Sequence, residues 1–158
     1  GAVGVVRRDS MAMKPFCGYN FGDYFAHWLS FDQAGAKLPK IFHVNWFRKG
    51  SDGKFLWPGF GDNLRVLEWM LKRCEGRVEA VDTPVGQLPQ RVDLNLDGLK
   101  ISEHAVEQLL HIDEHGWARE FEAIADYLDE FGTHTPARLR EEAARIAAQL
   151  PSVEQKVA

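Results

Sequence analysis

Aromatic and basic side chains are concentrated between Phe42 and Asn63 of this 158-residue chain, in the segment FHVNWFRKGSDGKFLWPGFGDN. Its aromatic residues are Phe42, Trp46, Phe47, Phe55, Trp57 and Phe60, and its cations are Arg48, Lys49 and Lys54. Rings on several sides suit a flat ligand, because stacking a base on an aromatic side chain contributes about 1–3 kcal/mol. The pattern therefore indicates a pocket for a flat ligand with a π face.

A polar group that recognises the edge of the base would have to accompany the rings, because stacking alone does not distinguish one base from another. Asn63 and the backbone N–H groups near Gly61 are candidates, since an amide side chain offers both donors and acceptors and an unmatched buried polar group is costly. The alternative is that the rings are plain core, because aromatic residues are common in paired strands. The residues alone leave both interpretations open.

Several elements are expected to position these residues. Two strands at about 40–48 and 54–57 would be joined by a turn at the glycine-rich sequence GSDG, whose residues tolerate turn geometry. A helix should follow at about 63–75, with an apolar stripe on one face. The stripe consists of Leu64, Leu67, Met70, Leu71 and Cys74. Asp62 and Asn63 are both good N-caps, and a helix N-terminus also offers free N–H groups to a ligand.

The periodicity of the remaining chain is mostly helical. A helix at about 21–30 should bury Tyr24, Phe25, Trp28 and Leu29. Residues 78–99 have low periodicity and are interpreted as an irregular arm. Ser102 should cap a helix to about His111, and Asp113 should cap another. The inward positions expected for this next helix are Trp117, Phe121, Ile124, Tyr127 and Leu128. Thr135-Pro136 should open the last helix.

Three histidines have a spacing that resembles a metal site. His104, His111 and His115 are seven and four residues apart, which could bring them to one side of a continuous helix. A cap at Asp113 and a glycine at Gly116 predict a break between them, and metal sites need fixed geometry. We therefore predict no metal site here.

Composition indicates one globular domain with a core. The net charge of −4 argues against general nucleic-acid binding, and residues 1–75 carry +4 whereas residues 76–158 carry −8. The aromatic half is thus the half suited to phosphates. Cys17 and Cys74 form no disulfide framework, which fits a reducing compartment, and no apolar run is long enough to span a membrane.

Three stretches carry a resemblance to a known family: MAMKPFCGYNFGDYFAHWLS, LPKIFHVNWFRKGSDGKFLWPGFGDNLRVLEWM and TPVGQLP. From about residue 11 to 99 the chain resembles the C-terminal part of GTP-dependent phosphoenolpyruvate carboxykinases. The resemblance implies a mixed α/β fold, with a few strands flanked by helices and a helical C-terminal tail. It implies that residues 1–100 carry the guanine pocket, with 1–10 the end of an active-site lid, and that 101–158 form an acidic helical tail.

The resemblance also implies a function and a set of site residues. The family converts oxaloacetate and GTP to phosphoenolpyruvate, carbon dioxide and GDP, as a cytoplasmic lyase of gluconeogenesis. Its guanine pocket corresponds here to Trp46, Phe47, Phe55, Phe60, Gly61, Asp62 and Asn63. Phe16 matches an aromatic residue near the substrate, and Cys17 stands where the family often has another aromatic residue.

The catalytic machinery is expected outside this sequence. The GxxxxGK[ST] signature of Walker-type phosphate loops is absent from it, and the family supplies its phosphate loop, Mn²⁺ and Mg²⁺ ligands and substrate arginines from segments upstream of Gly1. We therefore expect no catalytic or metal-binding residue in these 158 residues, and no activity from them alone. Their expected partners are the upstream part of the same, monomeric, enzyme and its small-molecule substrates. A standalone guanine-nucleotide-binding module and a purely structural piece are the alternatives.

Overall fold

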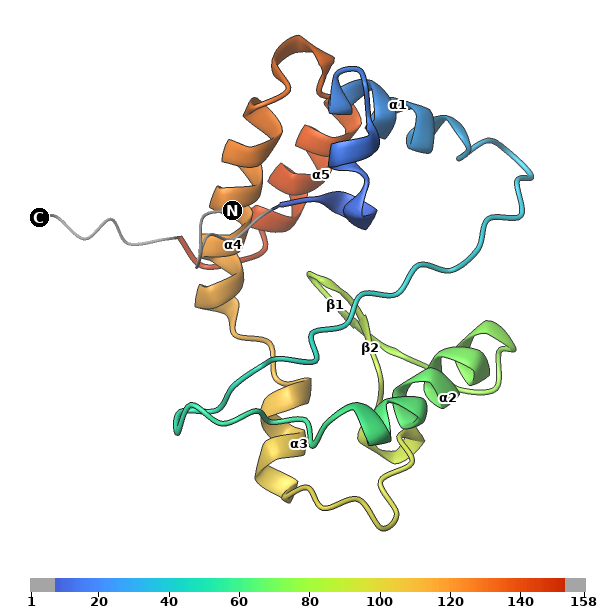
Figure 1. Cartoon of the computed structure of the whole chain (residues 1–158), viewed down its shortest axis with the longest axis vertical. Coiled ribbons are helices and arrows are strands. Elements are labelled where there is room, and N and C mark those ends of the chain that lie inside the picture. Colours follow the sequence, from blue (N-terminus) through green and yellow to red (C-terminus); the bar gives the residue numbers. More distant parts are fainter. Residues whose placement is uncertain (1–7, 153–158) are drawn as a thin grey trace, which may run out of the picture. The chain divides into compact units, whose positions relative to one another are not determined.

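The computed structural model describes residues 8–152, and residues 1–7 of the expected lid segment 1–10 therefore lie outside the described part. The chain divides into two compact units, one made of Gly1–Leu38 with Glu114–Ala158 and the other of Pro39–Asp113 (Figure 1). The described residues form five α helices and a two-stranded antiparallel sheet, which confirms the mixed α/β class. None of the helices within residues 8–152 is long and apolar enough to cross a membrane.

The first unit is helical. It contains α1 (Phe21–Ser30), α4 (Glu114–Asp129) and α5 (Ala137–Ala147), and α4 packs against α5 (Figure 1). Short 3₁₀ turns lie at Ser10–Ala12, Lys14–Phe16 and Gly132–His134. The predicted helix at 21–30 is confirmed, and the Asn20 side chain caps it by accepting a hydrogen bond from the Gly22 backbone N–H at 2.8 Å.

Aromatic rings form the core of this unit. Phe21, Tyr127 and Phe131 are buried together, and Tyr24 and Phe25 pack against them. The Phe21–Phe25 and Tyr127–Phe131 pairs meet edge to face, with centroids 4.9 and 5.0 Å apart, an arrangement that aromatic quadrupoles favour. The predicted core face of α1 is thus partly right: the most buried ring is Phe21, whereas Trp28 is exposed.

One glycine allows α1 to approach the 3₁₀ turn at Gly132–His134. A Cβ placed on Gly22 would lie 2.6 Å from the backbone oxygen of His134, closer than any real side chain stands. Beside this contact, the Nδ1 atom of His134 lies 2.8 Å from the Asp23 carboxylate. The N-terminal turn of α1 therefore depends on a residue without a side chain.

The second unit contains α2 (Asn63–Cys74), α3 (Glu103–Leu110), and the strands β1 (Val81–Thr83) and β2 (Gly86–Leu88). The strands pair antiparallel, with Val81 opposite Leu88. Two 3₁₀ turns lie at Phe60–Asp62 and Arg91–Asp93. The helix predicted at 63–75 is confirmed within one residue, as is the Ser102 cap of α3, which accepts from the Ala105 N–H at 3.1 Å.

Two secondary-structure predictions for this unit are wrong. Residues 40–48 and 54–57 do not form strands, and only Lys49 and Phe55 make an isolated antiparallel bridge. A strand needs a neighbouring strand along its whole length, and the segment before Lys49 has none among the described residues. Conversely, part of the arm predicted at 78–99 forms the β1–β2 hairpin, whose tight turn requires Gly86 at a φ of 126°.

The apolar stripe predicted on α2 is not buried by the described chain. Leu64, Leu67 and Leu71 are exposed, to 74%, 43% and 63%, and Cys74 is exposed as well. The buried residue of α2 is Trp69, whose ring meets Phe42 edge to face at 6.1 Å. The amphipathic pattern correctly predicted a helix, but residues 8–152 do not cover its apolar face.

Candidate functional site

A hydrogen-bonded reversal places the aromatic segment. The Leu56 N–H donates to Arg48 O at 2.9 Å and the Gly50 N–H to Lys54 O at 2.9 Å. The Asp52 carboxylate accepts from the Lys54 N–H at 3.0 Å inside the turn, as aspartate commonly does. The predicted turn is therefore confirmed, although the strands that it was expected to join are missing.

Ring pairs form on this reversal. Phe47 and Phe55 meet edge to face, with centroids 5.9 Å apart and planes at 62°. The Lys49 ammonium lies 5.4 Å from the centroid of Phe55, within the range of a cation–π contact. Trp46 stacks obliquely on Trp57 at 6.2 Å. Phe47 and Phe55 are exposed, so this pair leaves ring surface available, whereas Trp57 is buried.

Phe60 stands apart from these pairs. It lies in the 3₁₀ turn Phe60–Asp62 and is 92% exposed, and no other described ring contacts it. The turn is preceded by Gly59 at a φ of 142°, a conformation that favours glycine. The Asp62 N–H closes the turn onto Gly59 O at 3.1 Å, and open space surrounds Gly61. The exposed ring of Phe60 would gain apolar burial if a ligand or another part of the protein covered it.

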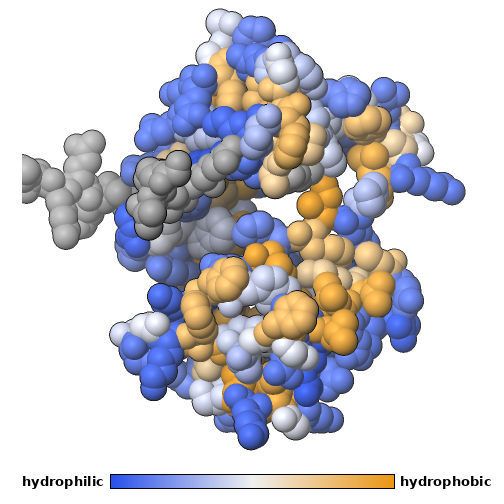
Figure 2. All heavy atoms as spheres, in the orientation of Figure 1, coloured by the Kyte–Doolittle hydropathy of each residue, from blue (hydrophilic) through white to orange (hydrophobic). Residues whose placement is uncertain are grey.

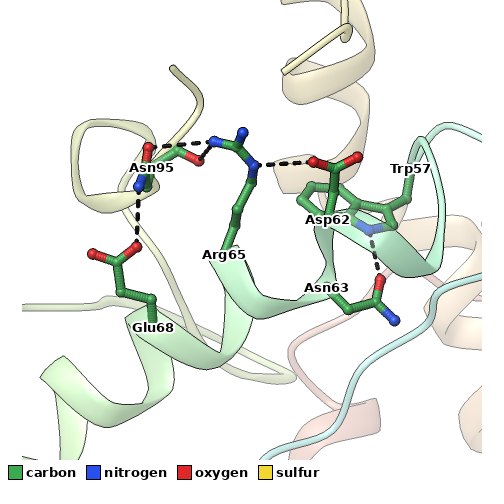
Figure 3. A network of polar contacts seen from close by, with 6 residues as sticks. All are labelled: Trp57, Asp62, Asn63, Arg65, Glu68 and Asn95. Atoms are coloured by element: carbon green, nitrogen blue, oxygen red, sulfur yellow. Dashed lines mark hydrogen bonds and ion pairs between the residues drawn. The ribbon is translucent and has the colours of Figure 1, made fainter. Parts of the chain in front are cut away.

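The Asn63 side chain is hydrogen-bonded to a tryptophan and does not cap a helix. The indole N–H of Trp57 donates to Asn63 Oδ1 at 2.9 Å (Figure 3). Asn63 is the first residue of α2, and neither its side chain nor that of Asp62 caps the helix. The capping role expected of these two side chains is therefore wrong, because each is engaged elsewhere.

A polar network fixes the turn to the neighbouring chain. Arg65 Nε lies 3.2 Å from the Asp62 carboxylate, and its Nη1 donates to Asn95 O at 2.8 Å (Figure 3). The Asn95 amide donates to Glu68 at 3.1 Å, and Lys72 pairs with Glu68 at 2.6 Å. Hydrogen bonds from Lys72 and then Asn95 lower the pKa of Glu68 below its usual value. The loop that carries Phe60 and Asn63 is thus tied to α2 and to Asn95.

Arg48 fixes the other end of the segment. Its guanidinium donates to Leu109 O at 3.3 Å and to His111 O at 3.2 Å, at the C-terminal end of α3. A cation there satisfies carbonyl groups that the helix leaves unpaired. The shallow pocket beside it is lined by Arg48, Lys49, Gly50, Ser51, Leu56, Gln108, His111 and Asp113. None of the predicted stacking rings lines this pocket.

Trp57, Arg65 and Asn95 position the segment but were not predicted to do so from the sequence. Trp57 was counted among the aromatic residues, and its burial could have been expected from its size. Its pairing with Asn63, six residues further on, has no sequence pattern. Arg65 stands three residues after Asp62 on a predicted helix, which is a recognisable spacing for an ion pair.

Other candidate residues lie away from this segment in the chain. Phe16, expected near a substrate, is exposed in the first unit, and its link to the pocket stays a prediction. The Cys17 thiol lies 3.7 Å from Tyr19 O. The predicted break between His104 and His115 is confirmed, because α3 ends at Leu110 and α4 begins at Glu114. Within residues 8–152, no three His, Cys, Asp or Glu side chains are grouped to bind a metal ion.

Comparison with known proteins matches residues 1–149 to the family model described as the phosphoenolpyruvate carboxykinase C-terminal P-loop domain. A relative from Chlamydia trachomatis named phosphoenolpyruvate carboxykinase [GTP] is 50% identical over 151 residues, which are 95% of this chain and 25% of the relative. Relatives with the same name from Renibacterium salmoninarum and Thermoplasma volcanium are 52% and 49% identical over 141 residues, 88% and 89% of this chain. The chain spans about a quarter of the length of these relatives.

Proposed function

Because the chain belongs to the family of GTP-dependent phosphoenolpyruvate carboxykinases, we propose that it is the C-terminal part of such an enzyme and carries its guanine pocket. The enzyme would convert oxaloacetate and GTP to phosphoenolpyruvate, carbon dioxide and GDP. The observation that carries the proposal for the pocket is the exposure of three phenylalanine rings, Phe47, Phe55 and Phe60, on the loops that lead into the fixed Asn63.

The proposed roles divide between stacking and recognition. Phe47, Phe55 and Phe60 hold the flat base and exclude water, with Trp46 at the edge of the pocket. Asn63, together with the backbone at Gly61 and Asp62, reads the polar edge of the base. The exposure of Phe47, Phe55 and Phe60 supports their stacking role, because a ring that is already buried in the core would bury no further surface against a ligand.

Phosphoryl transfer would be carried out elsewhere in the enzyme. It requires phosphates cradled by N–H groups, a lysine and a metal ion, and the side chains of residues 8–152 form no metal-binding group. Mn²⁺ and Mg²⁺ would neutralise the phosphates of GTP and GDP on ligands contributed by other parts of the enzyme. These 158 residues would provide the binding site for the base of the nucleotide but not the site for its phosphates. Phe16 would lie near the substrate.

The exposed leucines of α2 support the proposed partner, the upstream part of the same enzyme. Leu64, Leu67 and Leu71 recur at positions i, i+3 and i+7 and form one apolar stripe. Figure 2 shows apolar side chains, in orange, at the surface in the region that α2 occupies in Figure 1. Such patches mark surfaces that another part of a protein covers, and the relatives are about four times as long as this chain.

The test compares the 158-residue chain with the full-length enzyme. We expect GTP- and metal-dependent decarboxylation of oxaloacetate by the full-length enzyme, and no turnover by the chain above the metal-only background. GDP should quench the tryptophan fluorescence of the full-length enzyme at Trp46 and Trp57, and ADP should do so only at higher concentration. Turnover by the chain alone, or equal use of GTP and ATP by the enzyme, would contradict the proposal.

A further inference from the structure

We propose that Trp57 is a positioning residue for nucleotide specificity: it holds the Asn63 amide in the one orientation that presents hydrogen-bond donors to the base. This inference rests on the proposed function, because it requires Asn63 to face a bound base. It assigns a role to a residue that does not itself contact the ligand. It also restricts which bases the pocket can accept.

The orientation follows from the chemistry of the indole ring. An indole N–H can only donate, so the atom of Asn63 that lies 2.9 Å from Trp57 Nε1 must be the amide oxygen. The amide nitrogen then points away from Trp57, as Figure 3 shows. No acceptor for this NH₂ group is found among residues 8–152. Asn63 therefore offers two unused donors, while one of the two lone pairs of its oxygen accepts from Trp57.

Both partners are fixed in place. Trp57 is 8% exposed and its ring packs against Trp46. Asn63 is the first residue of α2, and its backbone N–H donates to Phe60 O. Burial does not by itself give an indole a partner in this unit: the N–H of Trp69 is buried without an acceptor in the described part of the chain. The pairing of Trp57 with Asn63 is therefore a specific feature.

A fixed donor that faces the six-position of a bound purine distinguishes purines by the substituent there, and the proposal places the Asn63 amide at this position. Guanine and hypoxanthine carry an oxygen there, which accepts a hydrogen bond, whereas adenine carries an amino group, which donates. Two donors facing each other leave both unmatched, and a site built to pair with one group rejects its mismatch strongly. Asn63 should therefore separate GTP and ITP from ATP, and the 2-amino group that distinguishes GTP from ITP must be read by other groups.

The test measures kcat/KM of the full-length enzyme for GTP, ITP and ATP in Trp57→Phe, which removes the N–H but keeps an aromatic ring. The released amide can rotate and offer its oxygen. We expect the GTP-to-ATP ratio to fall about 2- to 10-fold, the value of one neutral hydrogen bond, with the GTP-to-ITP ratio unchanged. The matched control is Trp46→Phe, the same chemical change in the neighbouring ring, which should weaken the three nucleotides together and change neither ratio.

A second variant, Asn63→Asp, keeps an acceptor for Trp57 but replaces the NH₂ group by an oxygen. Its negative charge weakens the binding of all three nucleotides. The ratio of kcat/KM for GTP to that for ATP should nevertheless fall further than in Trp57→Phe, because the exposed edge of the side chain then accepts hydrogen bonds instead of donating them. The inference is overturned if Trp57→Phe lowers all three kcat/KM values by one factor, which is the signature of a structural role. The proposed function fails separately, if Phe60→Ala leaves GTP, ITP and ATP unaffected.

Discussion

Replacing Phe60 by alanine should lower the affinity for nucleotides without lowering the stability of the fold. The ring is 92% exposed in this chain, so its removal takes almost no buried area from the fold of these residues, and the free energy of unfolding of the 158-residue chain should change by less than about 0.5 kcal/mol. Nearly all of the ring surface is instead available to a ligand. Burying a phenylalanine side chain contributes about 1.5–3 kcal/mol, close to the 1–3 kcal/mol measured for a base-stacking ring.

This free energy corresponds to a loss of about 5- to 150-fold in nucleotide affinity. The assay is calorimetric titration of the full-length enzyme and of its Phe60→Ala variant with GDP, IDP and ADP, beside urea unfolding of the 158-residue chain with and without the substitution. The loss should be the same factor for the three nucleotides, because stacking does not read the base edge. Phe31→Ala, another exposed phenylalanine, which contacts only the His27 ring among the described rings, serves as the control and should retain affinity. A change in base preference, or an unchanged Kd in Phe60→Ala, would refute the assignment of Phe60 as a stacking ring.

Three further predictions concern single residues. Gly22→Ala should destabilise the chain by about 1–3 kcal/mol in urea unfolding, because its Cβ meets His134 O. The control Gly18→Ala, whose Cβ meets nothing within 4 Å, should change stability by less than about 0.5 kcal/mol. Equal effects would contradict the close approach of Gly22 to His134. The pKa of Glu68 is lowered in the folded state, so its contribution to stability is present above the unfolded value of about 4.3 and is lost as pH falls through the folded value. The stability advantage of wild type over Glu68→Gln at pH 7 should therefore shrink as the pH is lowered below about 4.3, and an advantage that stays constant would disprove this. Gly59→Ala should lower nucleotide affinity, because alanine is strained at a φ of 142°; unchanged GDP binding would show that the turn tolerates the change.

Local signals in the sequence predicted the helices well. Caps and periodicity are properties of adjacent residues, so the Ser102 cap indicated where α3 begins and the spacing of aromatic residues indicated α1. The turn around Asp52 was predictable for the same reason. The strands at 40–48 and 54–57 were not, because a strand depends on a neighbour that the sequence does not name. The β1–β2 hairpin was missed because its strands have three residues each, too few for a period to emerge.

The candidate site was predictable by residue type but not by arrangement. The aromatic residues and Asn63 could be picked out from composition and from the family resemblance. The pairing of Phe47 with Phe55, and of Trp57 with Asn63, depends on how the loops close. The apolar stripe on α2 was predicted from its period, yet a period identifies a face that needs covering, not the segment that covers it.

The division of the chain into two units has a consequence for the order of folding. The unit Pro39–Asp113 is one continuous segment, whereas the other joins Gly1–Leu38 to Glu114–Ala158. Ion pairs such as Arg8 with Glu120, at 2.8 Å, connect residues 112 positions apart. The entropy of closing so long a loop is lost before these contacts form, and contacts of this separation slow folding. During synthesis on the ribosome, the continuous unit can fold as soon as it has emerged, but α1 must wait for α4 before its core can close.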